Sequence, residues 1–181
     1  MENVDNTQSN VTGTGSSPSK LIIGSIPIYI FCYIAVATWL LYDGWINNFS
    51  SLHCVWGSPN GQFSLPSHVV FSIYTILGAI LGSGLLGIIS FHRYVAIEKS
   101  FDDDHAWGFL FAPLLAAIIG ILMFSIIQSG LIVLSGQMSN IENESNATLG
   151  YLAIGAITGY NWDVFVRKMQ ELSSNILNTK P

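Results

Sequence analysis

The chain alternates between long apolar segments and shorter polar ones. Four apolar segments occupy residues 21–42, 66–91, 109–135 and 148–166, and their central parts carry no charged residue. An α-helix rises ~1.5 Å per residue, so about twenty residues cross the ~30 Å hydrocarbon core of a bilayer. The pattern therefore predicts an all-α integral membrane bundle of four transmembrane helices. The fourth segment has the weakest pattern, because Asn161 and Asp163 interrupt it.

Polar sequence flanks this predicted transmembrane domain, residues 21–166. Residues 1–20 have low hydrophobicity and no periodicity, which is typical of a disordered tail. A cleaved signal peptide would begin with its charged region and would have a shorter apolar region of ~7–15 residues. The first apolar segment instead follows some twenty polar residues. We therefore expect the first apolar segment to be retained as a transmembrane helix.

The C-terminal segment, residues 167–181, is predicted to be cytoplasmic and to continue an amphipathic helix that begins near residue 164. Its apolar positions recur at spacings of four, three and four residues, at Phe165, Met169, Leu172 and Ile176. Such a stripe can lie on a membrane, pack beneath the bundle or pair with copies of itself. Residues 164–177 contain only two cations, which disfavours a strong anchor on anionic lipid and favours contact with protein.

The scarcity and the placement of charge fix the class and the orientation. Charged residues make up 9% of the chain, against about a quarter in soluble domains. The six cations are Lys20, Arg93, Lys99, Arg167, Lys168 and Lys180. With four spans all six fall on one side, so the positive-inside rule places both termini in the cytoplasm of a cell-membrane protein. A three-span alternative would place Arg167 and Lys168 outside. Six dispersed cations also exclude a nucleic-acid surface.

Small residues at four-residue spacing mark three of the helices as tight-packing elements. In lipid, such rows allow helix backbones to approach closely. The rows comprise Gly78, Gly82, Ala79, Ser83 and Gly87 in the second segment, Ala112, Ala116 and Gly120 in the third, and Gly155 and Gly159 in the fourth. The rows fit the core of the bundle itself or a seam between subunits. Two rows on the second segment exceed what one neighbour needs, which favours an assembly.

Three polar side chains within or beside the spans are candidate functional contacts. Gln128 fits a hydrogen-bond donor between helices, with a permeation path as the alternative. Asn161 and Asp163 lie where the fourth predicted helix leaves the bilayer on the inner side, where they fit a polar ring at a pore mouth in an oligomer. The alternative for Asp163 is a cap on the following helix.

The loops contain two further kinds of candidate site. Asp102, Asp103, Asp104 and His105 form an acidic cluster, which fits a solvated linker better than a cation site because its spacing is not that of a calcium loop. Asn48, Asn143 and Asn146 lie in Asn-x-Ser/Thr triplets on the predicted outer side and are candidate glycosylation sites. Ordinary polar loops contain such triplets by chance. No catalytic motif, metal-ligand spacing or cofactor fingerprint occurs, so we expect neither an enzyme nor a bound cofactor or metal.

The C-terminal third carries one family resemblance. The run from Phe111 through Pro113 to Gly120 precedes a glycine-rich span, Gly150 to Gly159, and an amphipathic segment that ends near Leu172. In this order of features the chain resembles small uncharacterised prokaryotic four-helix membrane proteins. The resemblance implies a prokaryotic membrane protein and no particular activity.

The sequence thus predicts a multi-pass membrane protein that serves as a structural or accessory subunit, with lipid, copies of itself or other membrane subunits as partners. The alternative is a homo-oligomeric ion channel or pore lined by the fourth helix.

Overall fold

The computed structural model describes residues 20–52, 65–98, 104–130 and 144–177, and these contain helices without any strand. The two short elements are the 3-10 turn η1 (Ser50–Leu52) and the π-helical segment η2 (Arg93–Ile97). The α-helices are α1 (Lys20–Asn47), α3 (Ser67–His92), α4 (Asp104–Gln128), α5 (Glu144–Tyr160) and α6 (Trp162–Leu177). The helical fold class is confirmed for the described residues.

Three helical stretches are long and apolar enough to cross a membrane: Gly24–Asn47, Ser67–Ile97 and Ala106–Gln128. The fourth predicted span is shorter, because α5 has 17 residues and its apolar part is only Ala147–Tyr160. Seventeen residues extend ~26 Å, less than the ~30 Å hydrocarbon core. The structure therefore supports a membrane location with three spanning helices, and the predicted count of four is not confirmed.

Three helix C-terminal ends differ from the predicted ones, and α4 and α5 also begin earlier, at Asp104 and Glu144 instead of residues 109 and 148. α1 continues past residue 42 to Asn47, because the Asp43 carboxylate is satisfied locally by hydrogen bonds from the Asn47 side chain (3.0 Å) and the Ser51 backbone (3.1 Å). α4 ends at Gln128 rather than residue 135, and Gly130 follows with φ of 73°, a conformation that commonly ends helices. Residues 131–135 lie outside the described part.

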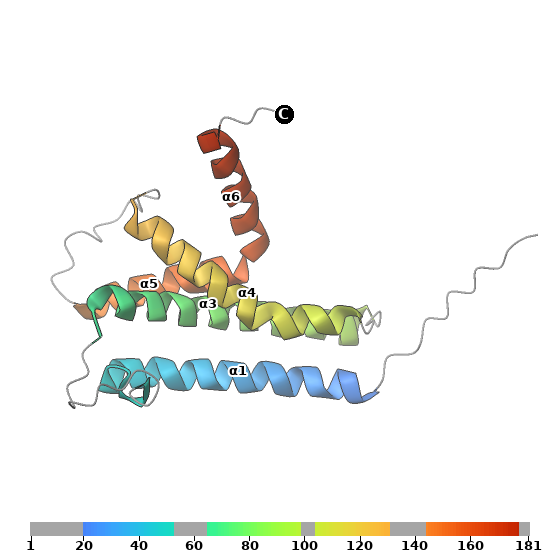
Figure 1. The fold of residues 1–181 in the computed structure, drawn as a ribbon. Coiled ribbons are helices and arrows are strands. Elements are labelled where there is room, and N and C mark those ends of the chain that lie inside the picture. The colour runs from blue at the N-terminus through green and yellow to red at the C-terminus, as the bar shows by residue number, and fades with distance from the viewer. Residues whose placement is uncertain (1–19, 53–64, 99–103, 131–143, 178–181) are drawn as a thin grey trace, which may run out of the picture.

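The third difference concerns residues 161–166, which were predicted to complete the fourth span. α5 ends at Tyr160 instead, and residues 162–166 belong to α6. The backbone nitrogen of Asn161 still donates a hydrogen bond to the Ile157 carbonyl at 3.1 Å, and the Asn161 side chain donates a second one to the same oxygen at 3.3 Å. Figure 1 shows α6 leaving the bundle at a steep angle after this junction.

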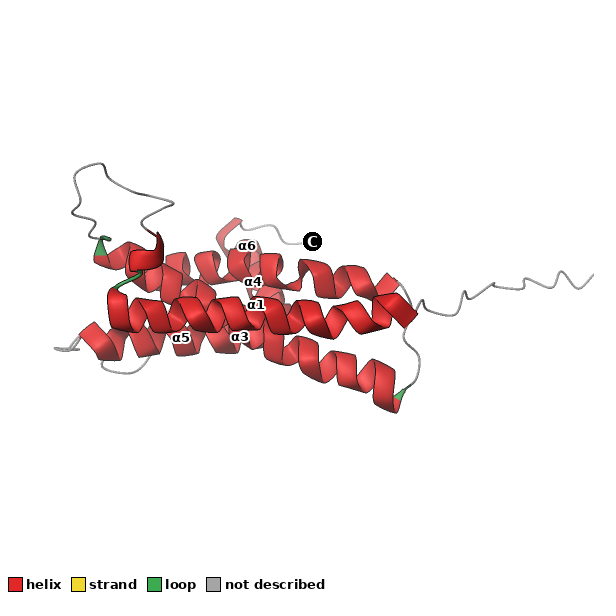
Figure 2. Cartoon of the chain, turned by 90° about the horizontal axis from the view of Figure 1, so that it is seen from below, coloured by secondary structure: helices red, strands yellow, loops and turns green. Residues whose placement is uncertain are grey.

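α3 is the central helix, and α1, α4 and α5 pack around it (Figures 1 and 2). Contacts between helices show the relative directions of the helices. Gly84 of α3 faces Ile34 of α1 while Gly87 faces Ile30, so α1 runs antiparallel to α3. α4 is also antiparallel, because Gly120 lies beside Ile76 whereas Ala112 lies beside Ser83. α5 runs parallel to α3, with Gly155 against Thr75 and Gly159 against Ala79. Consecutive helices therefore alternate in direction.

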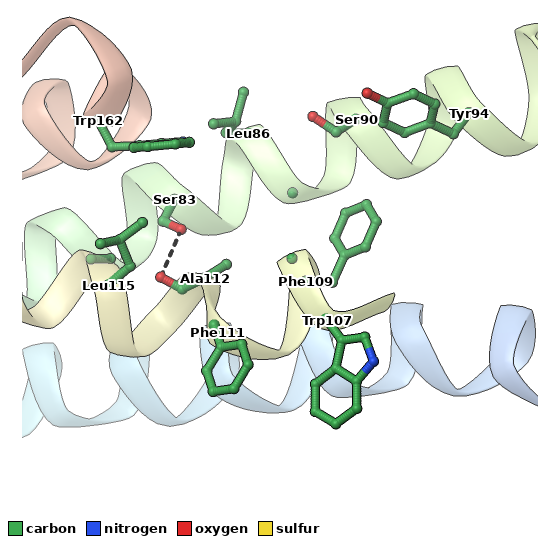
Figure 3. A pocket seen from close by; sticks show the side chains of 13 residues that line it. Ser83, Leu86, Ser90, Tyr94, Trp107, Phe109, Phe111, Ala112, Leu115 and Trp162 are labelled. Carbon is green, nitrogen blue, oxygen red and sulfur yellow. Dashed lines mark hydrogen bonds between the residues drawn. The ribbon is translucent and has the colours of Figure 1, made fainter. Parts of the chain in front are cut away.

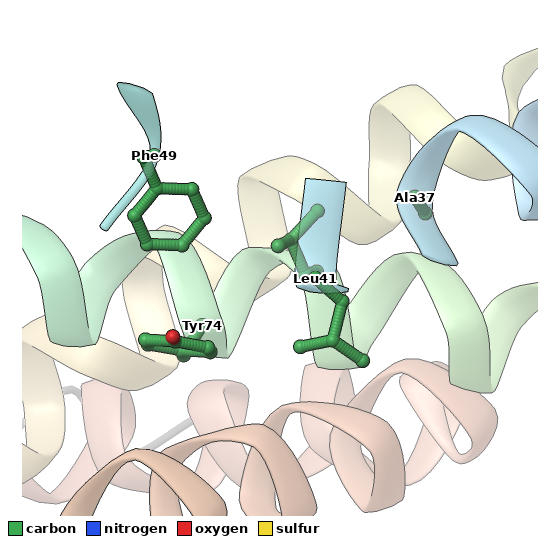
Figure 4. Close-up of a cluster of buried hydrophobic side chains, with 5 residues drawn as sticks. Ala37, Leu41, Phe49 and Tyr74 are labelled. Atoms are coloured by element: carbon green, nitrogen blue, oxygen red, sulfur yellow. The ribbon is translucent and has the colours of Figure 1, made fainter. Parts of the chain in front are cut away.

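The two ends of the bundle carry separate apolar clusters. We call the end at which α1 finishes and α3 begins the η1 end, and the opposite end the η2 end. At the η1 end the buried side chains of Ala37, Leu41, Phe49, Tyr74 and Leu77 pack together (Figure 4). Toward the η2 end, Ile26, Ile30 and Phe109 join α1 to α4. Lys20 and Arg93 begin α1 and η2, so both cations lie at the η2 end.

Candidate interaction surfaces

The contact between α3 and α5 is built from glycines on both helices. A Cβ atom added at Gly82 would overlap the carbonyl oxygen of Ala156, and one added at Gly155 would overlap that of Thr75. Gly78 and Gly159 are restricted in the same way, by Leu152 and Ala79 respectively. The two backbones thus approach so closely that only glycine fits, as small-residue motifs in membranes allow.

The remaining small residues of α3 face its other neighbours. Ala79 is fully buried between α4 and α5, and the Ser83 hydroxyl donates a hydrogen bond to the Ala112 carbonyl of α4 at 3.4 Å. Gly87 faces α1, where Tyr33 and Ile30 lie within 4 Å of an added Cβ. Both rows of α3 are therefore used by helices of the same chain, so the excess of rows no longer argues for an oligomer.

α4 contributes one row, which is divided along its length. Ala116 and Gly120 are buried, and Gly120 lies against the backbone of α3 at Ile76. Ala112 is half-buried, and Gly108, one turn earlier, is exposed with no atom within 4 Å of an added Cβ. The row thus packs at one end and opens at the other.

The polar side chains of α4 and α5 make contacts within the chain. Gln128 donates a hydrogen bond to the hydroxyl oxygen of Tyr151 at 3.1 Å, and the Tyr151 ring stacks on Phe71 of α3 with centroids 4.9 Å apart. Thr148 and Thr158 are buried, and the Thr158 hydroxyl donates a hydrogen bond to the Ile154 carbonyl at 2.7 Å. The contacts of Gln128 and Tyr151 join α4, α5 and α3, whereas the Thr158 bond lies within α5.

Asn161 and Asp163 do not lie at an end of the bundle. The backbone nitrogen of Tyr160 lies beside Gly82, whereas α3 and η2 continue for fifteen residues to Ile97. At ~1.5 Å per residue, this junction lies ~22 Å short of the η2 end. Asp163 forms an exposed ion pair with Arg167 at 3.2 Å within α6.

A groove lies where α5 no longer covers α3 and α4. It has a volume of about 610 Å³, and its walls are the second half of α3 and the first half of α4. In Figure 3, Trp162 lies across one end beside Ser83 and Leu86, while Tyr94 and Trp107 mark the other end. We call it the α3–α4 groove. Sequence reasoning missed it, because the groove exists only where α5 ends.

α6 makes few contacts with the bundle: it adjoins α5, and its first residue, Trp162, lies beside α3 at the end of the groove (Figures 1 and 3). Phe165, Met169 and Leu172 are half-buried, and we call them the α6 stripe. Around the stripe, exposed charges pair within the helix, including Lys168 with Glu171 at 2.7 Å. The fourth predicted stripe residue, Ile176, has no described side chain.

A second feature that sequence reasoning missed is the turn after α1. Asn48 and Phe49 both have positive φ, at 50° and 59°, and the Phe49 ring is fully buried against Gly44 and Tyr74. The small residue at Gly44, one turn before a bulky aromatic, was the available signal. Exposed Asn48 is the one predicted glycosylation site whose side chain is described.

Other predicted sites fall outside the described part of the chain. Asn143 and the side chain of Asn146 lie there, as do Asp102, Asp103 and the side chains of Asp104 and His105. Among the residues that the structure describes, no group of His, Cys, Asp and Glu could hold a metal ion. Cys32 is exposed and has a free thiol.

Comparison with known proteins adds no relative: no family model, curated protein or solved structure matches the chain. The resemblance of the C-terminal third to small prokaryotic membrane proteins therefore stays a prediction.

Proposed function

We propose that the protein is a structural or accessory subunit of a membrane assembly and that α6 is its docking arm. The observation that carries the proposal is the position of α6, which leaves the bundle ~22 Å short of the η2 end. The bundle at that level is flanked by exposed apolar side chains, including Leu85, Ile88 and Ile89 of α3. A charged helix that departs at this depth must meet protein or water rather than lipid.

The charges of α6 support contact with protein. Asp163 pairs with Arg167, and Lys168 pairs with Glu171, so the described ion pairs of α6 are internal and lower the cost of leaving bulk water. The α6 stripe is left with few contacts to the bundle, and an apolar helix face of this kind fits into a groove of another helical protein. We therefore expect copies of this chain or other membrane subunits to cover α6.

We also propose that the η2 end faces the cytoplasm. Lys20 and Arg93 lie at this end, and cations near membrane-spanning helices are retained on the cytoplasmic side. The channel hypothesis has less support. Thr148 and Thr158 are buried within the bundle, and Asp163 is paired, so the residues that would line a pore already have contacts inside one chain.

The Met169→Glu substitution tests the docking role. We expect the wild-type protein in mild detergent to form a particle whose protein mass is at least twice the 19.7 kDa of one chain. A carboxylate in the centre of the α6 stripe would be buried without a partner, so the M169E particle should fall to the mass of one chain. Light scattering coupled to size exclusion measures both masses.

The matched control is Gln170→Glu, which adds the same charge at the next, exposed position of α6. The Q170E protein should keep the wild-type particle mass. A wild-type particle of one chain, with no other protein present, would reject the subunit role.

A further inference from the structure

We propose that the α3–α4 groove binds one acyl chain of a membrane phospholipid, which enters from the leaflet at the η2 end. The groove begins beside the end of α5: Tyr160 of α5 lies beside Gly82 of α3, and Ser83, the next residue, lines the groove. Along α4, buried Ala116 gives way to half-buried Ala112 and exposed Gly108. Beyond the end of α5, none of the described helices covers this part of the α3 and α4 surface.

The length of the groove fits an acyl chain better than a transmembrane helix. Along α3 and the start of η2 the groove extends from Ser83 to Tyr94, eleven residues or ~16 Å. This is about half of the ~30 Å hydrocarbon core, which is the depth of one leaflet. A transmembrane helix of another chain crosses both leaflets, and its other half would collide with α5. An acyl chain ends at the bilayer midplane and needs no further space.

The two ends of the groove differ as a lipid site requires. Trp162 lies across the end next to α5, which we call the closed end (Figure 3). Tyr94 and Trp107 lie at the open end. Tyrosine and tryptophan are enriched at the membrane surface because their rings are amphipathic. Between the ends the walls are formed mainly by apolar side chains such as Leu86, Phe109 and Leu115. The volume of about 610 Å³ falls within the ~300–1,000 Å³ of small-molecule sites.

The experiment uses a photoreactive phospholipid that attaches covalently to the protein residues nearest the end of its acyl chain. The full chain is reconstituted into phosphatidylcholine vesicles that contain a phosphatidylcholine with a diazirine at the end of one acyl chain. After illumination, peptide mass spectrometry measures labelling at the closed end of the groove, at Leu115, Ala116 and Trp162. Val36 is the internal reference, because this exposed α1 residue lies near the same level and meets only surrounding lipid. We expect labelling at the closed end to exceed that at Val36 several-fold.

Two matched glycine substitutions decide whether the groove is responsible. Gly108→Phe fills the open part of the groove, and Gly24→Phe adds the same side chain to α1. Neither glycine has an atom within 4 Å of an added Cβ, so both variants should fold. G108F should reduce labelling at the closed end to the level at Val36, and G24F should leave the wild-type ratio. If G108F does not fold, Leu86→Trp fills the groove from the opposite wall.

Two results would overturn the proposal. Closed-end labelling in the wild type no higher than at Val36 would mean ordinary surrounding lipid, or a groove occupied by protein. Equal closed-end labelling in the wild type and in a folded G108F or L86W protein would mean that the label arrives by another route. The test is independent of the docking role of α6, because M169E changes the particle mass and leaves the groove intact.

Discussion

Replacing Gly82 with leucine should separate α5 from α3 and destabilise the fold by more than about 3 kcal/mol, the upper end of typical overpacking costs. The clash is unusually severe because the obstacle is the backbone of α5: a Cβ at this position overlaps the carbonyl oxygen of Ala156. Backbone atoms of a helix cannot rotate aside as a side chain can. Unfolding of the detergent-solubilised protein by sodium dodecyl sulfate, followed by circular dichroism, measures the loss.

The control for this prediction is Gly24→Leu. Gly24 is also in a helix, is exposed, and has no atom within 4 Å of an added Cβ. Leucine is a better helix former than glycine by up to about 1 kcal/mol, so G24L should be neutral or slightly stabilising. Similar stability of G82L and G24L would contradict the close packing of α3 on α5.

Replacing Phe49 with alanine should cost about 3–5 kcal/mol, as removal of a buried phenylalanine does in well-packed cores. Phe49 is fully buried, its ring lies 5.2 Å from that of Tyr74, and it also covers Gly44 of α1. Because this ring joins the turn after α1 to α3, its loss should loosen the whole η1 end. The same unfolding titration measures the effect.

Phe31 provides the comparison for Phe49. It is 73% exposed on α1, facing away from the bundle, so F31A removes the same ring from the surface instead of the core. We expect F31A to change the free energy of unfolding by less than about 0.5 kcal/mol in detergent. An F49A protein as stable as F31A would mean that the turn is not packed as described.

Hydrophobicity along the chain predicted where the long helices lie but not where they end. The apolar segments locate α1, α3 and α4, because the cost of placing polar backbone in lipid makes long apolar runs helical. The ends depend on local contacts that hydrophobicity does not report. Asp43 was expected to end the first span, yet two hydrogen bonds satisfy its carboxylate and α1 continues to Asn47.

The small-residue rows show a similar limit at the level of packing. Their spacing predicted faces for close approach, and in the structure Gly155 and Gly159 of α5 lie against the α3 backbone. It could not assign partners, because a glycine row fits any neighbour equally well. α3 proved to serve three helices at once, which removed the apparent surplus. The groove was unpredictable for a related reason: it is defined by the end of α5 at Tyr160, which the apolar pattern through residue 166 did not mark.

The parallel packing of α5 on α3 also constrains how the protein is made. The contact between Thr75 and Gly155 joins residues eighty positions apart, with the whole of α4 between them. A ribosome therefore completes α3 and α4 before the first residue of α5 is synthesised. α5 alone is too short to cross a bilayer, so we expect its position to depend on packing against α3 and α4, which are synthesised earlier. If α3 and α4 pair slowly, α5 remains without its packing partner for longer. We expect more of such a protein to be degraded before it folds, so that less of it accumulates even if the folded form is stable.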